Sequence, residues 1–310
     1  MTFQFRRIPK SEIDSFRKNG YVRLPGFLSR EIVEYLRGIS DEMSSQSRSI
    51  LKLSRIAGES LARRAQVYRS ELIVVPEAAD PSQVCKYEFM IGGNHAFRSF
   101  AANYVQTTVS HVMGCDVLPF KDKANEKLPG GGAFRPHQDS AAYRFFKPRY
   151  YVTALLTIDN ATQLNGCLNF ATNFHQLIRR KPTFVAEKIA GNALLHSING
   201  GSSHGDIRPD VVRALRWKPL PLCPADLVIF DSYIPHFSEA NKSTSPRRAI
   251  FVTYNMASEG SFYDHYYAEK RANFDDPKFH IATPTSHRDL PSQSKAMGKA
   301  SQANDLRATA

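Results

Sequence analysis

The chain has 310 residues, of which 42% are hydrophobic and 23% charged, so it can bury a substantial core and has the composition of a globular protein. It holds no run of roughly 18 apolar residues, the length a membrane-spanning helix needs, and its four scattered cysteines argue against a disulfide framework or a zinc knuckle. The net charge of +12 suits an anionic partner, but the basic residues are dispersed and match no nucleic-acid module, so we expect no nucleic acid.

The two ends of the sequence carry no targeting signal. The opening MTFQFRRIPK lacks the apolar segment of a secretory signal, and the closing LRATA is neither a peroxisomal nor a retention address. We therefore expect a cytoplasmic protein without a membrane partner. The oligomeric state is not encoded in any pattern that we recognise.

Helical patterns dominate residues from about 10 to 114. Ser11 resembles the first residue of a capping box, and Ser29 can cap a second helix with an apolar face. Residues 41 to about 70 are helical or irregular, and the polar run SSQSRS inside them predicts a loop. The stretch FRSFAANYVQTTVSHVMG predicts a helix that ends at Gly114.

Strand-like patterns dominate residues from about 115 to 257. Short runs rich in Val, Ile, Thr, Tyr and Phe, such as RYYVTALLTID and RAIFVTYNMAS, alternate with turn clusters such as GGGAFRP and NKSTSPR. Many short strands without intervening helices predict a jelly roll or a barrel rather than a parallel α/β sheet. The polar, aperiodic residues 287–310 predict a flexible tail.

The stretch FRPHQDSAAYRFF places His137 and Asp139 two residues apart near the expected end of a strand. Such a pair offers an imidazole nitrogen and a carboxylate oxygen, and one more imidazole would complete a two-histidine, one-carboxylate iron site. His-x-Asp also arises by chance, so a third ligand has to be found. His236 has the best setting, because it follows the strand-like run ADLVIFDSYIP and precedes a polar loop and another strand.

Two arginines open the strand after His236. Alternation along that strand sends Arg247 and Arg248 to opposite faces, so one of them can point inward and pair with the far carboxylate of a bound 2-oxoacid. The alternative is a pair of solvated arginines at the end of a strand. The residues alone leave both interpretations open.

The segments PHQD, NGCL and PADLVIFDSYIPHFSEANKSTSPRRAI, in this order, resemble the phytanoyl-CoA hydroxylase-like branch of the iron(II)/2-oxoglutarate-dependent dioxygenases. The opening FRKNGYVRLPGFLSREIVEYLR resembles the same branch, so that residues 10–270 are covered. The resemblance implies a mainly β (α+β) fold: a double-stranded β-helix (jelly-roll, cupin-like) core with N-terminal helices packed on one sheet, in a single domain over residues 1–286. It implies iron(II) held by His137, Asp139 and His236, with 2-oxoglutarate and O2 as co-substrates.

The same resemblance implies which residues bind 2-oxoglutarate. Arg247 occupies the position of the basic residue that meets the far carboxylate, and Arg248 is the fallback. A hydroxyl two residues after His236 and a basic residue in CKYEF match further contacts. The complete set expected at the co-substrate is Arg247, Ser238, Lys86, Gln138 and Thr153.

The implied reaction oxidises a C–H bond of a small substrate and releases succinate and CO2. Related halogenases carry a small residue at the carboxylate position, so Asp139 favours hydroxylation. Two alternatives stay open: an oxidase, desaturase or cyclase of the same fold that acts on a secondary metabolite, and a non-catalytic β-sandwich binding protein.

Four polar residues share one face of the strand that leads into the His-Gln-Asp segment: Lys121, Lys123, Asn125 and Lys127. If that face looks inward it suits an anionic substrate, and if it looks outward it is a solvated edge that discourages aggregation. The stretches FKDKANEKLPGGG and YYAEKRANF resemble 2-aminoethylphosphonate hydroxylases and related fungal enzymes, which implies an anionic or zwitterionic substrate such as an aminophosphonate or an amino acid. Candidate pocket residues, with ordinary packing or loop polarity as the alternative, are Tyr143, Tyr151, His204 and Asp206.

Overall fold

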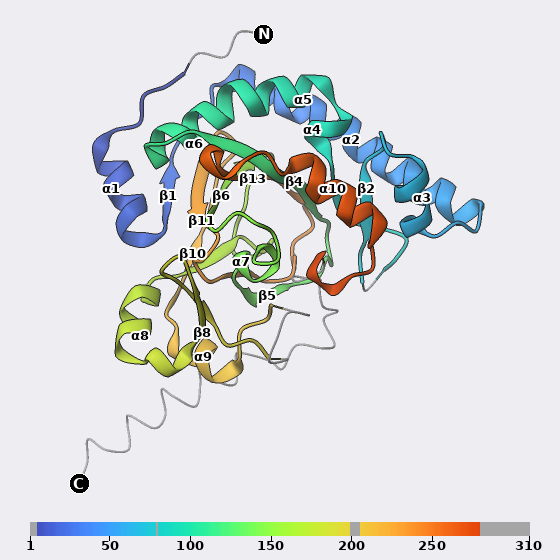
Figure 1. Ribbon diagram of the computed structural model, residues 1–310. Coiled ribbons are helices and arrows are strands. Elements are labelled where there is room, and N and C mark those ends of the chain that lie inside the picture. The colour runs from blue at the N-terminus through green and yellow to red at the C-terminus, as the bar shows by residue number, and fades with distance from the viewer. Residues whose placement is uncertain (1–4, 79, 199–204, 280–310) are drawn as a thin grey trace.

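The computed structural model describes residues 5–78, 80–198 and 205–279 (Figure 1). The tail expected at 287–310 and the candidate His204 therefore lie outside the described residues. Within them, two antiparallel sheets and a short hairpin form the β part of the molecule, and helices cover one face of the larger sheet. This arrangement confirms the α+β, jelly-roll expectation.

The larger sheet has seven strands in the order β1-β11-β6-β13-β4-β3-β2, and the smaller sheet has four in the order β10-β7-β12-β5. Every neighbouring pair is antiparallel. The strands of the larger sheet are β1 (Tyr21–Leu24), β2 (Ile73–Pro76), β3 (Val84–Glu88), β4 (Val117–Lys127), β6 (Tyr151–Thr157), β11 (Leu227–Asp231) and β13 (Arg247–Met256). Those of the smaller sheet are β5 (Phe134–His137), β7 (Leu168–Ala171), β10 (Trp217–Leu220) and β12 (His236–Ser238), and β8 (Val185–Ile189) pairs only with β9 (Asn192–Leu195).

Because successive side chains of a strand point to opposite faces, the two faces of the larger sheet pack into two different hydrophobic cores. On β6, Ala154 and Leu156 join the cluster that includes the helices, whereas Leu155 joins the cluster that includes Phe170 of the smaller sheet. We call the side that carries Leu155 the inner face and the opposite, helix-covered side the outer face. The inner face lies between the two sheets, where a jelly roll encloses its interior.

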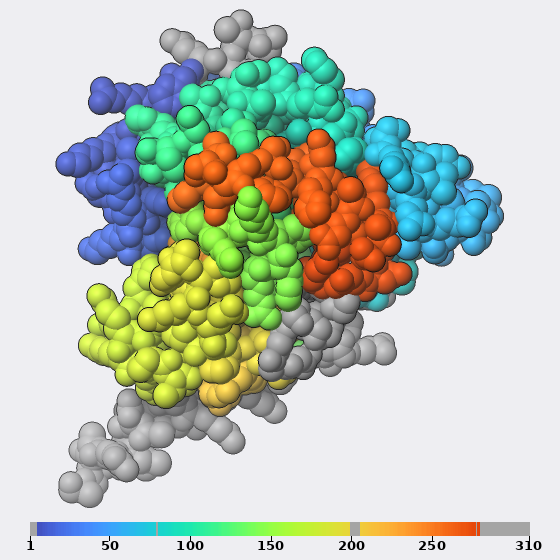
Figure 2. All heavy atoms as spheres, viewed as in Figure 1, coloured from blue at the N-terminus to red at the C-terminus, as the bar shows by residue number. Residues whose placement is uncertain are grey.

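Helices cover the outer face (Figure 1) and close the ends of the molecule. Figure 2 shows the C-terminal segment, coloured orange to red, packed between the N-terminal helices and the green segment that contains α7. The helices are α1 (Lys10–Asn19), α2 (Arg30–Ile56), α3 (Leu61–Val67), α4 (Met90–Gly93), α5 (His95–Phe100), α6 (Gln106–Met113), α7 (Ser140–Tyr143), α8 (Phe174–Arg180), α9 (Pro209–Ala214) and α10 (Tyr263–Ala272). No helix among the described residues is both long and apolar enough to cross a membrane.

The expectation of a loop at SSQSRS was wrong, because α2 continues through it to Ile56. Ser44 and Ser47 are buried on the face of α2 that packs on the sheet. Ser44 donates a hydrogen bond to Glu126 of β4, and the Ser47 hydroxyl donates to the Ser44 carbonyl at 2.9 Å. The small polar side chains thus allow a close approach of helix and sheet, and tertiary contacts override the local preference of serine for turns.

The expected helix ends were confirmed at two positions and wrong at one. Ser29 caps α2 by accepting a hydrogen bond from the Ile32 amide at 3.3 Å, and Gly114 ends α6 with a φ of 71°. Ser11 does not cap α1, which begins at Lys10 directly after Pro9.

The mostly helical residues 10–114 also contribute strands β1, β2 and β3 to the larger sheet. β1 pairs with β11 at one edge, and β3 pairs with β4 on the other side. Residues 10–114 therefore form three strands of the larger sheet as well as helices that pack on it. Helix α10, which the sequence did not predict, returns to contact β4.

Candidate metal centre

Strands β5 and β12 place His137 directly opposite His236, with ring centroids 4.4 Å apart. Each Nδ1 atom donates to the backbone carbonyl two residues earlier, at 2.6 Å to Arg135 and at 3.0 Å to Ile234. A carbonyl oxygen can only accept, so these bonds place the hydrogen on Nδ1. Both Nε2 atoms are left without it and are free to bind a metal.

Asp139 lies two residues beyond the end of β5, where α7 begins, and turns its carboxylate toward both imidazoles. Its oxygens lie 3.7 Å from the Nε2 atom of His137 and 4.0 Å from that of His236. All three side chains are buried, and one donor atom from each lies within 4.8 Å of the others. Two imidazoles and one carboxylate are the donors that non-haem iron(II) takes in oxygenases, so this set fits that ion.

The electrostatics favour the protonation state that a metal requires. Burial, and then the neighbouring His236, lower the pKa of His137 to about 3, and burial also lowers the pKa of His236. Burial alone would raise the pKa of Asp139, but Lys123 and the two imidazoles outweigh it and lower that pKa to about 2. The cluster is therefore two neutral imidazoles and one carboxylate at neutral pH.

Arg247 points to the inner face and Arg248 to the outer face, so one arginine does point inward. Arg247 is 1% exposed, and its Nε and Nη2 atoms have no hydrogen-bond partner among the described residues. Burial lowers its pKa to about 10, so it stays charged at neutral pH. Arg248 instead donates two hydrogen bonds of 2.9 Å to Asp159 and one to Asp41.

Lys127 connects Ser238 to the strand position opposite Arg247. Lys127, opposite Arg247 in the β4–β13 ladder, donates to the Ser238 hydroxyl at 2.8 Å and to the Glu239 carbonyl at 2.5 Å. Lys86 lies 3.6 Å from Glu88 instead. The sequence placed Lys127 only on a possible substrate face, because the Lys127–Ser238 contact joins residues 111 positions apart.

The remaining two residues expected at the co-substrate lie in different settings. The Gln138 amide donates to the carbonyls of Ala193 and Tyr233 and accepts from the Leu195 amide at 2.8 Å. These bonds hold the segment between His137 and Asp139 against β9 and the turn before β12. Thr153 is on the inner face, where its hydroxyl lies 2.9 Å from that of Thr253.

The face with Lys121, Lys123, Asn125 and Lys127 looks inward. These residues pair in register with Thr253, Phe251, Ala249 and Arg247, and Phe251 and Ala249 belong to the core between the sheets. The outward alternative is therefore wrong. The structure adds two interior residues that the sequence did not single out: Glu88 of β3, and Lys270 of α10, which lies 2.7 Å from it.

Of the candidate pocket residues that the structure describes, Tyr143 and Asp206 lie close to the inner face or the candidate ligands, whereas Tyr151 does not. The Tyr143 ring lies next to the amine of Lys121, at 5.6 Å, just beyond Asp139 in the chain. Tyr151 packs against Phe120 in the core under the helices and donates to the Tyr143 carbonyl at 3.2 Å, so packing explains it. Asp206 forms an isolated bridge with His137 at the edge of β5.

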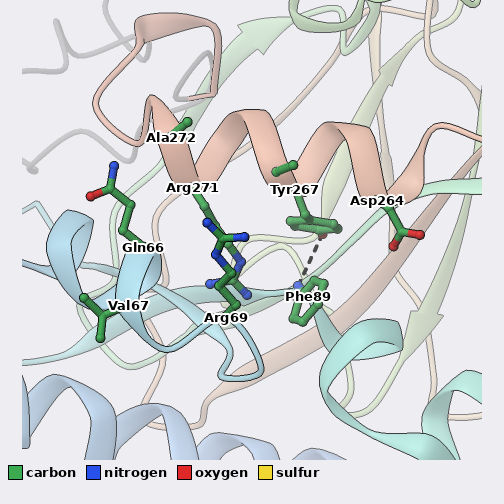
Figure 3. A pocket seen from close by; sticks show the side chains of 9 residues that line it. Gln66, Val67, Arg69, Phe89, Asp264, Tyr267, Arg271 and Ala272 are labelled. Carbon is green, nitrogen blue, oxygen red and sulfur yellow. Dashed lines mark hydrogen bonds between the residues drawn. The ribbon is translucent and has the colours of Figure 1, made fainter.

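A groove of about 490 Å³ lies between α3 and α10 and contains none of the three candidate ligands. Figure 3 shows Tyr267 and Arg271 pointing from α10 toward Phe89 at its floor, with the Tyr267 hydroxyl 3.3 Å from the Phe89 amide. Arg271 donates to the Ala65 and Glu71 carbonyls at 2.7 and 2.9 Å. These bonds fix α10 to the rest of the chain.

The fold and the two-histidine, one-carboxylate cluster define the class of protein as a non-haem iron oxygenase of the jelly-roll type. The sequence profile of the phytanoyl-CoA dioxygenase (PhyH) family matches residues 16–249, about three quarters of the chain, and the chain belongs to this family. It is therefore an iron(II)- and 2-oxoglutarate-dependent dioxygenase, as the resemblance in sequence implied.

Two curated relatives align over most of the chain. The methylphosphonate hydroxylase of Gimesia maris is 29% identical over 265 residues, which cover 85% of this chain and 87% of the relative. The 2-aminoethylphosphonate dioxygenase of an uncultured bacterium is 29% identical over 266 residues, 84% of this chain and 86% of the relative. Among solved structures, EctD from S. alaskensis superposes with a TM-score of 0.59 over 81% of this chain and 77% of its own, at 15% identity, which supports the fold.

Proposed function

We propose that His137, Asp139 and His236 hold iron(II), and that the enzyme hydroxylates a small phosphonate. The observation that carries the proposal is the charge of the interior between the two sheets. Six cationic side chains face it or lie beside it, against three carboxylates: Lys86, Lys121, Lys123, Lys127, Lys270 and Arg247 against Glu77, Glu88 and Asp139.

This interior has a formal excess of three positive charges, six minus three, when every group is ionised. Iron(II) and the dianion 2-oxoglutarate cancel each other, so that the excess remains once both have bound. Unpaired buried charge is costly, and an anionic substrate lowers that cost. A phosphonate carries up to two negative charges on three oxygens, and both curated relatives are named for phosphonates.

The co-substrate end is formed by Arg247, Ser238 and Lys127. The free Nε and Nη2 atoms of Arg247 offer a forked pair of donors to the far carboxylate of 2-oxoglutarate, at a place where water has little access. Ser238 and Lys127 supply a hydroxyl and a second cation beside it. Thr153 adds a hydroxyl on the same face.

When bound, the iron supplies the activation of O2 that the organic side chains lack. The protein's part is to orient and to exclude water. The carbonyls of Arg135 and Ile234 hold both imidazoles by Nδ1, and Gln138 holds the segment between the two ligands of the His-Gln-Asp stretch. Buried lysines on the inner face orient an anionic substrate.

Purified protein with iron(II), ascorbate, 2-oxoglutarate and methylphosphonate or 2-aminoethylphosphonate tests the proposal through succinate release. We expect turnover that depends on iron and on a phosphonate, and that falls by more than about 100-fold in His137→Ala and Asp139→Ala, because each removes a ligand. Metal analysis should show less bound iron in both variants. Unchanged iron content together with full activity would overturn the assignment of the ligands.

A further inference from the structure

Glu88 lies at the centre of a buried group of lysines that the iron centre does not use. One of its oxygens is 2.7 Å from the Lys270 amine and 3.6 Å from that of Lys86, and the other is 3.9 Å from the Lys121 amine. None of these four residues is more than 6% exposed. We call this group the Glu88 cluster. It joins β3, β4 and α10.

The Glu88 cluster faces the same interior as the iron ligands. The Lys121 amine lies 5.6 Å from the ring centre of Tyr143 and 5.1 Å from that of Tyr266. Tyr143 ends the short helix that begins after Asp139, and the charge of Lys121 contributes to the lowered pKa of Asp139. The cluster therefore lies beside the Asp139 side of the centre.

The Glu88 cluster and the co-substrate end lie at different positions along β4, the former around Lys121 and Lys123 and the latter at Lys127. Lys127 pairs with Arg247 at one end, whereas Lys121 pairs with Thr253 six residues away. At about 3.4 Å per residue Lys121 is roughly 20 Å from Lys127 along the strand, and the Glu88 position, opposite Lys123, is roughly 14 Å from it. The Lys121 side of the cluster is therefore separate from the co-substrate end, whereas Lys86, opposite Asn125, lies between the two.

Lys270 is held in place by its own helix. Neighbouring residues Tyr267 and Arg271 point the other way, toward the groove of Figure 3, where Arg271 donates to the Ala65 and Glu71 carbonyls. The Tyr267 hydroxyl bonds to Asp122 on the outer face. These bonds orient α10, and the 2.7 Å contact with Glu88 holds the Lys270 amine, so that less side-chain entropy is lost on binding.

The cluster has three cations for one carboxylate, a buried excess that pairing within the protein does not remove. Burial lowers the pKa of Lys270 to about 7. Burial also opposes the charge of Lys121, but Glu88 together with Tyr143, Asp139 and Asp122 outweighs it, so that the pKa of Lys121 is raised. A small oxyanion with several acceptor oxygens relieves the excess, since each amine can donate to it. Glu88 itself is shared by all three amines, and no second carboxylate lies in the cluster.

We propose that the Glu88 cluster binds the phosphonate group of the substrate and makes the enzyme select alkylphosphonates without an amino group. This rests on the proposed function. The ammonium of an aminoalkylphosphonate would enter a space lined by lysines, where the one carboxylate is already paired, and like charges at short range cost several kcal/mol. Methylphosphonate is therefore the better substrate of the two tested above.

Steady-state kinetics of Lys270→Met and Lys121→Met test the subsite. We expect each to raise the KM for methylphosphonate by about 10- to 100-fold, since each removes one charge-assisted hydrogen bond of about 1.5–3 kcal/mol, with less than about a two-fold change in the KM for 2-oxoglutarate. Lys270→Arg should recover part of the loss. Lys218→Met, at an exposed position of β10, is the matched control and should leave both constants unchanged.

Glu88→Gln should change the KM for methylphosphonate in the opposite direction to the lysine substitutions. It frees the three amines and should lower the KM for methylphosphonate, whereas a purely structural role predicts a less stable protein with no lower KM. The kcat/KM ratio of methylphosphonate to 2-aminoethylphosphonate should exceed about 10 in the wild-type enzyme. A preference for the amino compound would overturn the selectivity.

Thermal unfolding of the iron-free protein separates failure of the subsite from failure of the proposed function. Methylphosphonate should raise the Tm of the wild type and of Lys218→Met, and raise it less in Lys270→Met and Lys121→Met. Succinate release with phosphonates, but with the same KM in the lysine variants, would overturn the subsite and leave the function standing. Equal Tm shifts in all variants would also overturn the subsite.

Discussion

Both faces of the β4–β13 ladder bury charged side chains, but the two faces differ in how far these side chains are paired within the protein. On the outer face, Asp122 accepts hydrogen bonds from the Met90 amide at 2.7 Å, the Ile91 amide at 2.9 Å and the Tyr263 hydroxyl at 2.8 Å. Arg248 on that face is paired with two aspartates. These groups hold helices to the sheet, and their bonds are made within the protein.

On the inner face of the same strands, some hydrogen-bond donors and acceptors have no partner among the described residues. Arg247 has two nitrogens, and Asn125 an oxygen, without a hydrogen-bond partner among the described residues, and the Glu88 cluster has more cations than carboxylates. Buried polar groups are nearly always satisfied in proteins, so a concentration of unsatisfied ones marks a place where ligands bind. Adjacent residues on one strand thus serve stability on one face and binding on the other.

Comparing Arg247→Met with Arg248→Met is the strongest test of this contrast. Loss of the buried Arg247 charge should cost about 2–4 kcal/mol of 2-oxoglutarate binding, a rise in KM of roughly 30- to 1000-fold. Arg248→Met should leave that KM within about two-fold and lower the free energy of unfolding by about 1–3 kcal/mol, because it breaks bonds to Asp159 and Asp41. Equal effects of the two substitutions on KM would contradict the assignment of faces.

Asp122→Ala tests the outer face. It leaves two backbone amides and the Tyr263 hydroxyl without their acceptor, so we expect the free energy of unfolding to fall by about 3 kcal/mol or more. Denaturant unfolding measures this. A matched change at the inner face, Asn125→Ala, should cost less stability, because the Asn125 side-chain oxygen has no partner to lose.

Gln138→Ala tests whether this residue positions the ligands or binds the co-substrate. Its three backbone bonds hold the segment between His137 and Asp139, so we expect iron affinity to fall by about 10- to 100-fold. Iron titration measures the effect, and the KM for 2-oxoglutarate at saturating iron should stay near the wild-type value. A rise in that KM without a loss of iron affinity would restore Gln138 as a co-substrate contact.

Asp231→Asn should change how the stability of the protein depends on pH. Burial raises the pKa of Asp231 to about 7 in the folded protein, against about 4 in an unfolded chain. The folded state therefore binds the additional proton between these values, so this group makes stability fall as the pH rises from about 4 to 7. Unfolding at several pH values should show a flatter profile for Asp231→Asn, whose amide oxygen can still accept from the Tyr233 amide.

Local patterns in the sequence were sufficient to predict much of the fold and to choose three candidate iron ligands. Alternation predicted the strands around Lys121 and Arg247, and the Ser29 cap and the Gly114 helix end depend on neighbours within four residues. His137, Asp139 and His236 could be chosen because their spacing and flanking strands resemble a family pattern. Alternation also predicted that Arg247 and Arg248 point to opposite faces.

Contacts between distant segments were not predictable in this way. The serine run of α2 is helical because Ser44 contacts Glu126 across 82 residues, and Lys127 contacts Ser238 across 111. Which side of the lysine strand looks inward depends on the sheet that covers it, and alternation alone is symmetric between the two sides. Glu88 and Lys270 become neighbours only when α10 returns to the sheet.

The sequence by itself determined the class of protein, the strands and the choice of three candidate iron ligands, because these depend on short-range periodicity and on a motif of fixed spacing. Only the tertiary structure decided which lysines face the interior between the sheets, which backbone groups Gln138 contacts, and that more basic than acidic side chains are buried there. The physical reason is that burial and pairing of charge are properties of the assembled interior, where residues of three or more segments meet and water is absent.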